Sequence, residues 1–463
     1  MVVCMFKVKA SIGVAFCLIL LSVLRANAQA PLAPAPPMGW NSWDSFGLTI
    51  TEEQFRAAAA VEAARLKSSG FQYAVVDEGW YLGNPEAADK HPETLQYRTD
   101  ANGRYQPALN RFPSATAASG FTEIAASVHA KGLKFGIHII RGVPKSAVKA
   151  NLPVANSAFH AADLADTSDV CFWNPDNYGV KDNPAGQAWY DAMFAQYAKW
   201  GVDYVKVDCI SSHPYKADEI RMIHKAILKT GRPIVLSLSP GPTALSNAEE
   251  VGKLAQLWRI SNDVWDNWTA SKDKDEFPQS VKSQFAVIDS WTKYVKPGNW
   301  PDADMLPLGS LRPTPGWGTA RDTKLTHDEQ RTLITLWSIS RSPLFFGGNL
   351  TQLDDWTSSL LTNPAVLAMN QHGTGQHQSY SQNNVVAWVS KSQPSKGPAG
   401  QTYLALFNLS DTPASVDSPL TTYGVTPGKY KSRDLWTKSM QPASDKITAT
   451  IPPHGTLVLA LTK

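Results

Sequence analysis

Apolar and polar segments alternate along the first three-quarters of the chain. Segments with helical periodicity, such as 51–69, 185–200 and 326–340, separate short apolar segments that end in polar residues. Eight such apolar segments have the composition of strands: 38–43, 71–77, 133–140, 202–208, 233–239, 255–261, 300–306 and 344–348. Strands that are apolar almost throughout are typical of a parallel sheet covered by helices. The pattern therefore predicts an α/β fold, a (β/α)8 TIM barrel.

The pattern changes near residue 375. Short alternating segments then follow one another without helices between them, and Gly, Pro, Ser and Asp separate them: 385–389, 403–408, 430–434, 447–451 and 456–460. This is the pattern of an antiparallel sheet with one buried face. We expect a catalytic barrel over 29–374 and a C-terminal antiparallel β-sandwich over 375–463 that carries no chemistry of its own.

The first 28 residues have the features of a secretory signal peptide. Lys7 and Lys9 precede an apolar run, 10–24, and Ala26-Asn27-Ala28 has the form of a cleavage site. The run is too short to span a bilayer. The sequence predicts cleavage after Ala28 and a secreted or periplasmic protein.

Charge argues against two classes of partner. The chain has 43 Lys and Arg against 40 Asp and Glu, and three of the basic residues lie in the predicted signal peptide. The mature chain is thus formally neutral. Nothing in its charge favours nucleic acid or an anionic membrane surface.

Two of the four cysteines, Cys4 and Cys17, leave with the signal peptide. Cys171 and Cys209 remain, and in an oxidising compartment a disulfide between them is expected. The alternative is two separate buried thiols.

Polar residues collect where the predicted strands end. In a TIM barrel these ends form the mouth where catalysis is built. The residues are Trp40, Asp44, Asp77, Glu78, His138, Arg141, Lys206, Asp208, Ser239, Arg259, Asp263, Asp302 and Asp304. An excess of carboxylates beside Trp, Lys and Arg is suited to a polyhydroxylated substrate, whereas metal-ligand spacing and a glycine-rich phosphate loop are both missing from the sequence. We expect no cofactor and no metal.

Two carboxylates are candidates for glycosidic bond cleavage. Asp208 ends the fourth predicted strand, two residues after Lys206, and Asp263 follows the sixth. A retaining glycosidase needs two carboxyl groups about 5–5.5 Å apart, one as nucleophile and one as acid/base. The alternatives are an ordinary strand-end carboxylate at Asp208 and a structural Arg259–Asp263 ion pair.

Six motifs in order along the chain resemble glycoside hydrolase family 27, which holds the α-galactosidases and the α-N-acetylgalactosaminidases. They are MGWNSW at 38–43, DEGW at 77–80, KVD at 206–208, WRISND at 258–263, WPDADML at 300–306 and SRSPL at 340–344. The resemblance extends from residue 37 to the end of the chain. It implies a TIM barrel followed by a β-sandwich.

The resemblance also implies roles for individual residues. Asp208 matches the family's nucleophile and Asp263 its acid/base. Further matches are to groups that bind the sugar: Lys206 and Arg259 as hydroxyl ligands, Trp40 as the aromatic wall, Asp77 and Glu78 at O4 and O6, and Asp304 with Asp302 bracing the pocket floor.

Four positions depart from the family pattern, and we count all four as candidate substrate-binding residues. Glu78 replaces an aspartate, and its extra methylene carries the carboxylate about 1.5 Å further. That change either excludes the hydroxymethyl group of galactose, which favours β-L-arabinopyranose, or is met by a wider pocket. His138 replaces a tyrosine, Cys209 directly follows Asp208 where one residue usually intervenes, and Ser239 is small enough to admit an N-acetyl group.

The sequence thus predicts a retaining exo-α-galactosidase acting on galactose-containing oligosaccharides or polysaccharide side chains. β-L-Arabinopyranosidase and α-N-acetylgalactosaminidase are the alternatives on the same fold. The alternative of another class is a non-catalytic galactoside-binding protein.

Overall fold

The computed structural model describes residues 31–116, 119–270, 277–312, 318–393 and 400–463. The predicted signal peptide, 1–28, lies outside them. Among the described helices, none has the length and apolar character needed to cross a bilayer.

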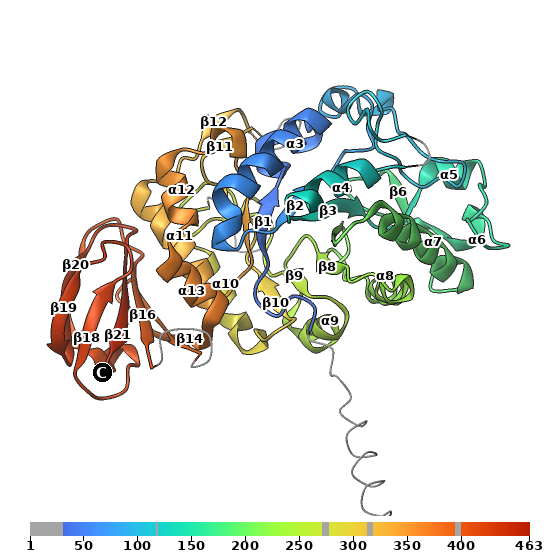
Figure 1. Cartoon of the computed structure of the whole chain (residues 1–463). Coiled ribbons are helices and arrows are strands. Elements are labelled where there is room, and N and C mark those ends of the chain that lie inside the picture. Colours follow the sequence, from blue (N-terminus) through green and yellow to red (C-terminus); the bar gives the residue numbers. More distant parts are fainter. Residues whose placement is uncertain (1–30, 117–118, 271–276, 313–317, 394–399) are drawn as a thin grey trace, which may run out of the picture.

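Eight parallel strands form the barrel predicted from the sequence (Figure 1). In spatial order they are β10 (Trp300–Asp302), β9 (Leu257–Arg259), β8 (Val235–Leu238), β7 (Tyr204–Asp208), β3 (Lys134–Ile140), β2 (Tyr73–Val76), β1 (Met38–Asn41) and β13 (Leu344–Phe346). Leu306, just beyond β10, pairs in parallel with Phe346 of β13. This bridge closes the ring.

Helices cover the outside of the barrel. They are α3 (Glu52–Val61), α4 (Thr122–Ala130), α7 (Pro184–Trp200), α8 (Ala217–Thr230), α9 (Ala248–Leu254), α10 (Gln284–Trp291), α11 (His327–Ser340), α12 (Asp355–Leu361) and α13 (Pro364–His372). The short helix α2 (Trp43–Phe46) follows β1 at the mouth of the barrel. Local sequence fixes several ends. Thr51 caps α3 in a capping box with Gln54. Asn183 is the N-cap of α7, and Gly201, in the left-handed region, is its C-cap.

The interior of the barrel is apolar at one end of its axis and polar at the other. At one end the rings of Tyr73, Tyr204 and Phe345 pack together, with centroids 5.3–6.2 Å apart. Side chains two residues apart on a strand share a face, so Lys206 and Asp208 continue the row begun by Tyr204. The apolar end supports the fold, and the polar end forms the mouth.

One insertion was not expected from the sequence. Between β3 and α7, where the sequence pattern predicts no strand, the chain forms a small sheet and two short helices. These elements are β4 (Val143–Pro144), α5 (Lys145–Lys149), α6 (Ala161–Leu164), β5 (Ala165–Val170) and β6 (Asn177–Val180), with β6 in the middle of the sheet. Its strands are short, and the longest of them, β5, is polar and largely exposed, so no apolar alternation marks them. A second small pair, β11 (Ser310–Leu311) and β12 (Arg321–Asp322), lies near α2.

The C-terminal region is the predicted antiparallel β-sandwich, drawn in red in Figure 1. One sheet has the order β14 (Gly373–Gln382), β15 (Val385–Ser392), β16 (Thr402–Asn408), β21 (Thr456–Thr462), β18 (Tyr430–Asp434) and β19 (Met440–Ser444). The other pairs β17 (Ala414–Pro419) with β20 (Lys446–Ile451). Val416 and Ile447 of the smaller sheet share a core with Leu404 and Leu459 of the larger one.

A turn of the sandwich packs against helix α11 and against the segment between β9 and α10. The His454 ring hydrogen-bonds Glu329 of α11 at 2.7 Å and Asp411 at 2.8 Å, and its backbone carbonyl accepts a bond from Thr332. The same ring stacks on Trp268 with centroids 4.3 Å apart. The sandwich therefore contacts the segment between β9 and α10, which also carries Asp263.

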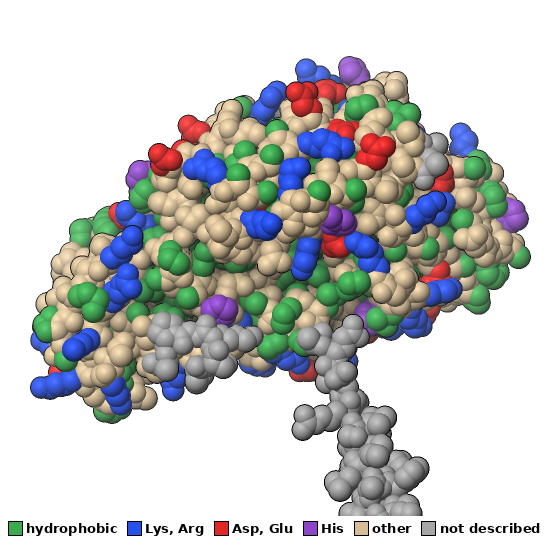
Figure 2. Space-filling view, viewed as in Figure 1, with side chains coloured by type: hydrophobic (Ala, Val, Ile, Leu, Met, Phe, Trp, Pro, Cys, Tyr) green, Lys and Arg blue, Asp and Glu red, His purple; other side chains and the backbone are tan. Residues whose placement is uncertain are grey.

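On the face drawn in Figure 2, Lys and Arg side chains are spread out among other types.

Candidate active site

A cavity of about 420 Å³ opens at the carboxyl ends of the barrel strands. It brings together five of the residues predicted from the sequence: Asp77, Glu78, Lys206, Asp208 and Asp263. The remaining lining residues are Trp43, Phe172, Trp173, His213, Pro240, Asn262, Phe277 and Met305. No cluster of metal-ligating side chains occurs within the described parts of the chain.

Lys206 and Asp77 form a buried ion pair at the base of the cavity. Lys206 Nζ donates to Asp77 Oδ2 at 3.0 Å, and Asn41 Nδ2 donates to the same oxygen at 2.7 Å. Burial would raise the pKa of Asp77, but the charges of Lys206 and His138 outweigh it and lower the pKa to about 2. At any pH well above 2, Asp77 is therefore an ionised carboxylate that accepts hydrogen bonds.

Asp208 is held at both carboxylate oxygens. His138 Nε2 lies 3.2 Å from Oδ2, and the backbone N–H of Cys209 donates to Oδ1. Burial would lower the pKa of His138, but Asp77 and the hydrogen bond to Asp208 raise it instead. The His138 ring and the Cys209 amide thus hold the Asp208 side chain at both oxygens, and a nucleophile must be held in a fixed position in this way.

Arg259 joins Asp263 to Asp304. One nitrogen lies 3.1 Å from Asp263 Oδ1 and another 2.7 Å from Asp304 Oδ2. Asp304 also accepts the backbone N–H of Val264 at 2.7 Å, next to Asp263. Burial raises the pKa of Asp304 to about 7, with Arg259 opposing and Asp263 adding to the shift. The Asp263 side chain is 38% exposed, against 14% for Asp208, so Asp263 is the carboxylate nearer to solvent.

Glu78 contacts a segment far away in the sequence. Asn174 Nδ2 donates to Glu78 Oε1 at 2.5 Å, across 96 residues. Burial raises the pKa of Glu78 to about 7; His138 opposes this shift and Asp208 adds to it. Near neutral pH the Glu78 carboxyl is thus able to donate a hydrogen bond as well as to accept one.

Other predicted site residues lie behind the cavity lining. Trp40 is fully buried, donates from Nε1 to the Gly348 carbonyl at 2.9 Å and packs on Phe55. The aromatic side chain that lines the cavity from this motif is Trp43. Ser239 is 2% exposed and lies directly before the lining residue Pro240.

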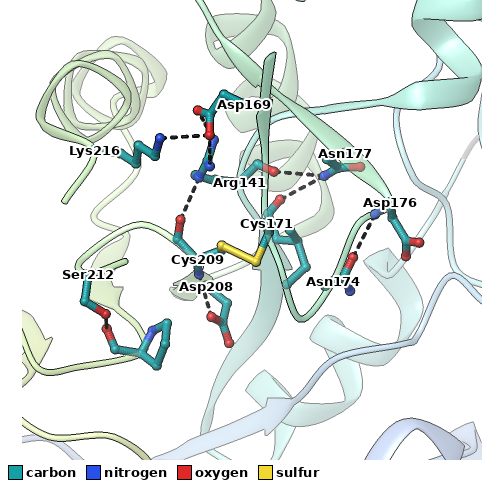
Figure 3. Close-up of a disulfide and its surroundings, with 12 residues drawn as sticks. Arg141, Asp169, Cys171, Asn174, Asp176, Asn177, Asp208, Cys209, Ser212 and Lys216 are labelled. Carbon is teal, nitrogen blue, oxygen red and sulfur yellow. Dashed lines mark hydrogen bonds and ion pairs between the residues drawn. A yellow bond between two sulfur atoms is a disulfide. The ribbon is translucent and has the colours of Figure 1, made fainter. Parts of the chain in front are cut away.

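The structure joins Cys171 to Cys209 by a disulfide, with Cα atoms 6.1 Å apart (Figure 3). The backbone of Cys209 turns sharply, with φ +60° in the left-handed region, directly after Asp208. Its carbonyl accepts a bond from Arg141 Nε at 2.6 Å. The disulfide therefore ties the β5–β6 segment to the residue next to Asp208.

We expect the double substitution Cys171→Ser/Cys209→Ser to lower the free energy of unfolding by about 2–4 kcal/mol, because the bridge closes a loop with a sequence separation of 38. Urea denaturation of the two oxidised proteins measures the difference. Reduced wild-type protein is the control and should match the double variant. Equal stability of the oxidised wild type and the variant would contradict this expectation.

Several lining residues were not among the predicted site residues: Trp43, Phe172, Trp173, His213, Pro240, Asn262, Phe277 and Met305. Phe172 and Trp173 follow Cys171 directly. The possible disulfide was the signal that could have identified them, because it brings their segment next to Asp208.

Comparisons with known proteins agree with this geometry. Residues 177–372 match the family described as alpha galactosidase A, and 382–461 match the alpha galactosidase C-terminal beta sandwich domain. An alpha-galactosidase of Cyamopsis tetragonoloba is 28% identical, covering 95% of this chain and 89% of its own. An alpha-galactosidase A of Cellvibrio japonicus is 29% identical, covering 77% and 72%.

A solved structure is more similar. It is a β-L-arabinopyranosidase of glycoside hydrolase family 27 from Geobacillus stearothermophilus, 41% identical, with a TM-score of 0.86 over 93% of this chain and 97% of its own. These similarities indicate an enzyme that acts on sugars. The barrel, the sandwich and the carboxylate-lined mouth agree with them. The chain belongs to glycoside hydrolase family 27 and is a glycoside hydrolase.

Proposed function

We propose that the protein is a retaining exo-glycosidase that removes terminal α-D-galactosyl residues from oligosaccharides or polysaccharide side chains. One observation carries the proposal: Asp208 and Asp263 line the same cavity, together with Lys206. Both carboxylates raise the pKa of Lys206, although burial opposes them. The two acids are thus close enough to a common cation for each to act on its charge.

The mechanism has two displacements. Asp208 attacks the anomeric carbon and forms a glycosyl ester, while Asp263 donates a proton to the glycosidic oxygen, which leaves as an alcohol. Asp263 then takes a proton from water, the water oxygen attacks the same carbon, and the ester bond to Asp208 breaks. Two inversions retain the anomeric configuration.

The neighbours of the two acids support these roles. The contacts from His138 and the Cys209 amide hold the Asp208 carboxylate in one orientation. Asp263 is more exposed, as is suitable for a group that must reach both a leaving oxygen and water. Arg259 fixes the side chain of Asp263 without burying it.

The polar base of the cavity is suited to one terminal sugar. Asp77 and Lys206 present an acceptor and a donor 3.0 Å apart, an arrangement that matches a pair of adjacent hydroxyl groups. Trp43 adds an aromatic wall. We propose that these groups bind the galactose hydroxyls and that Glu78 lies toward C6.

A second candidate, β-L-arabinopyranosidase, is favoured by Glu78. Its longer side chain extends from the strand end into the cavity and is held there by Asn174. β-L-Arabinopyranose has the hydroxyl pattern of galactose but no C6, so it leaves room for this carboxyl. The 41% identical relative is named for that activity. Ser239, on which the α-N-acetylgalactosaminidase alternative rests, is 2% exposed and is not among the residues that line the cavity.

The test compares p-nitrophenyl α-D-galactopyranoside with p-nitrophenyl β-L-arabinopyranoside. We expect both to be hydrolysed, and proton NMR should show the starting anomeric configuration in the first sugar released. The ratio of kcat/KM between the two substrates decides between the candidates. An inverted first product would overturn the double displacement, and inactivity on both substrates would overturn the choice of sugar.

A further inference from the structure

Three aromatic side chains surround the outer part of the cavity. Phe172 is 75% exposed and Trp173 36% exposed, and both line the cavity together with His213. The rings meet edge to face, with centroids 4.7 Å apart for Phe172–Trp173 and about 6 Å apart for each with His213. We call these three residues the aromatic rim. Single exposed apolar side chains are ordinary, but a group that lines a catalytic cavity indicates a ligand.

The segment that carries Phe172 and Trp173 is anchored on both sides of these two residues, and Figure 3 shows the anchors at Asp169, Cys171 and Asn177. Four contacts hold it: Arg141 and Lys216 bind Asp169, Cys171 is bridged to Cys209, Asn174 donates to Glu78, and Asn177 donates to the carbonyl of Arg141. Phe172 and Trp173 lie between these anchors and present their rings to solvent. A fixed aromatic surface loses little conformational freedom when it binds a ligand.

We propose that the aromatic rim binds the sugar on the leaving-group side of the scissile bond, a pyranose ring that stacks its C–H face on one of the perpendicular Phe172 and Trp173 rings and contacts the other. This inference rests on the proposed function. The base of the cavity is charged and lies around Asp77 and Lys206, so the terminal sugar occupies it. The leaving group must then extend toward the side of the cavity that is open to solvent, where Asp263 is partly exposed.

The chemistry of the rim favours a pyranose over a charged or a flexible apolar group. Aromatic faces match the flat C–H surface of a sugar ring, and polar groups around them reach its hydroxyls. His213 and Asn262 both line this part of the cavity and supply such groups. Lys206 is the cation among the lining residues, and Asp77 already pairs with it at the base.

The kinetic test compares a substrate that has a leaving-group sugar with one that has none. Galactosyl-α-1,6-glucose and α-galactosyl fluoride share the terminal sugar, and the β-L-arabinopyranosyl equivalents serve if that sugar is preferred. We expect Phe172→Ala and Trp173→Ala each to lower kcat/KM for the disaccharide by about tenfold and to change kcat/KM for the fluoride less than twofold. Trp173→Phe should restore most of the loss. Leu228→Ala, at an exposed site on α8, is the matched control.

A binding test keeps this inference separate from the proposed function. Calorimetry with a sulfur-linked, non-hydrolysed disaccharide should give a Kd about tenfold lower than the methyl glycoside of the terminal sugar, and Trp173→Ala should abolish the difference. Equal losses on both kinetic substrates, or equal affinity for both ligands, would overturn the inference. A wild type that binds the disaccharide through the rim but hydrolyses no substrate would overturn the proposed function alone.

Discussion

Replacing Asp208 by asparagine is expected to lower kcat/KM by about 10⁴-fold or more while the protein stays folded. The amide keeps the shape of the side chain and its contact with the Cys209 N–H, but it cannot attack the anomeric carbon. The measurement is hydrolysis of the better p-nitrophenyl glycoside, together with the thermal midpoint of each protein. Asp208→Gly in the presence of azide gives a sharper result: azide should occupy the vacated space and yield a glycosyl azide of inverted configuration.

The matched control lies at the other end of the same strand. Asp203, just before β7, binds the Phe135 N–H at 2.9 Å and contacts Arg232 and His129. Catalytic side chains are not expected at this end of a barrel, where side chains contribute to stability. Asp203→Asn should therefore lower the thermal midpoint and leave kcat/KM of the folded protein nearly unchanged. If both variants lost activity equally, the nucleophile assignment would be wrong.

Shortening Glu78 to aspartate is expected to raise the galactoside-to-arabinopyranoside ratio of kcat/KM by about tenfold or more. Removing one methylene withdraws the carboxylate from the region assigned to C6, and a methylene in such a pocket accounts for about 1–3 kcal/mol of discrimination. The two p-nitrophenyl glycosides measure the ratio.

Glu78→Gln separates length from charge. Glutamine keeps the reach of the side chain, so the ratio should stay near the wild-type value if length decides the preference. Burial keeps the pKa of Glu78 near 7, so the neutral amide resembles a form that the wild type already adopts. A shift in Glu78→Gln as large as that in Glu78→Asp would contradict the steric explanation.

How far the sequence predicts the fold depends on the kind of interaction. The barrel strands could be identified because burial on both faces makes them uniformly apolar, and Thr51 could be identified as a cap because its partner Gln54 is local. The β4–β5–β6 sheet could not, because β4 and β6 are short, β5 is polar, and their backbone pairing leaves no side-chain pattern.

The same distinction applies to the site. Strand-end carboxylates such as Asp77, Asp208 and Asp263 reach one cavity because the barrel topology brings their strand ends together. Asn174 and Trp173 reach it only through a loop whose course depends on a disulfide and distant hydrogen bonds. Trp40 and Trp43 lie in one motif, and the choice between them depends on where β1 ends, at Asn41.

The stacking of His454 on Trp268 has a consequence for engineering. Because the β-sandwich supplies this ring to the segment that begins at Asp263, the two halves of the chain cannot be exchanged as independent modules. A chimera that combines this barrel with another enzyme's C-terminal part would need an aromatic residue at the equivalent turn and an acceptor for α11. Without them the segment that carries Asp263 would lose its outer support, even though every residue at the barrel mouth were still present.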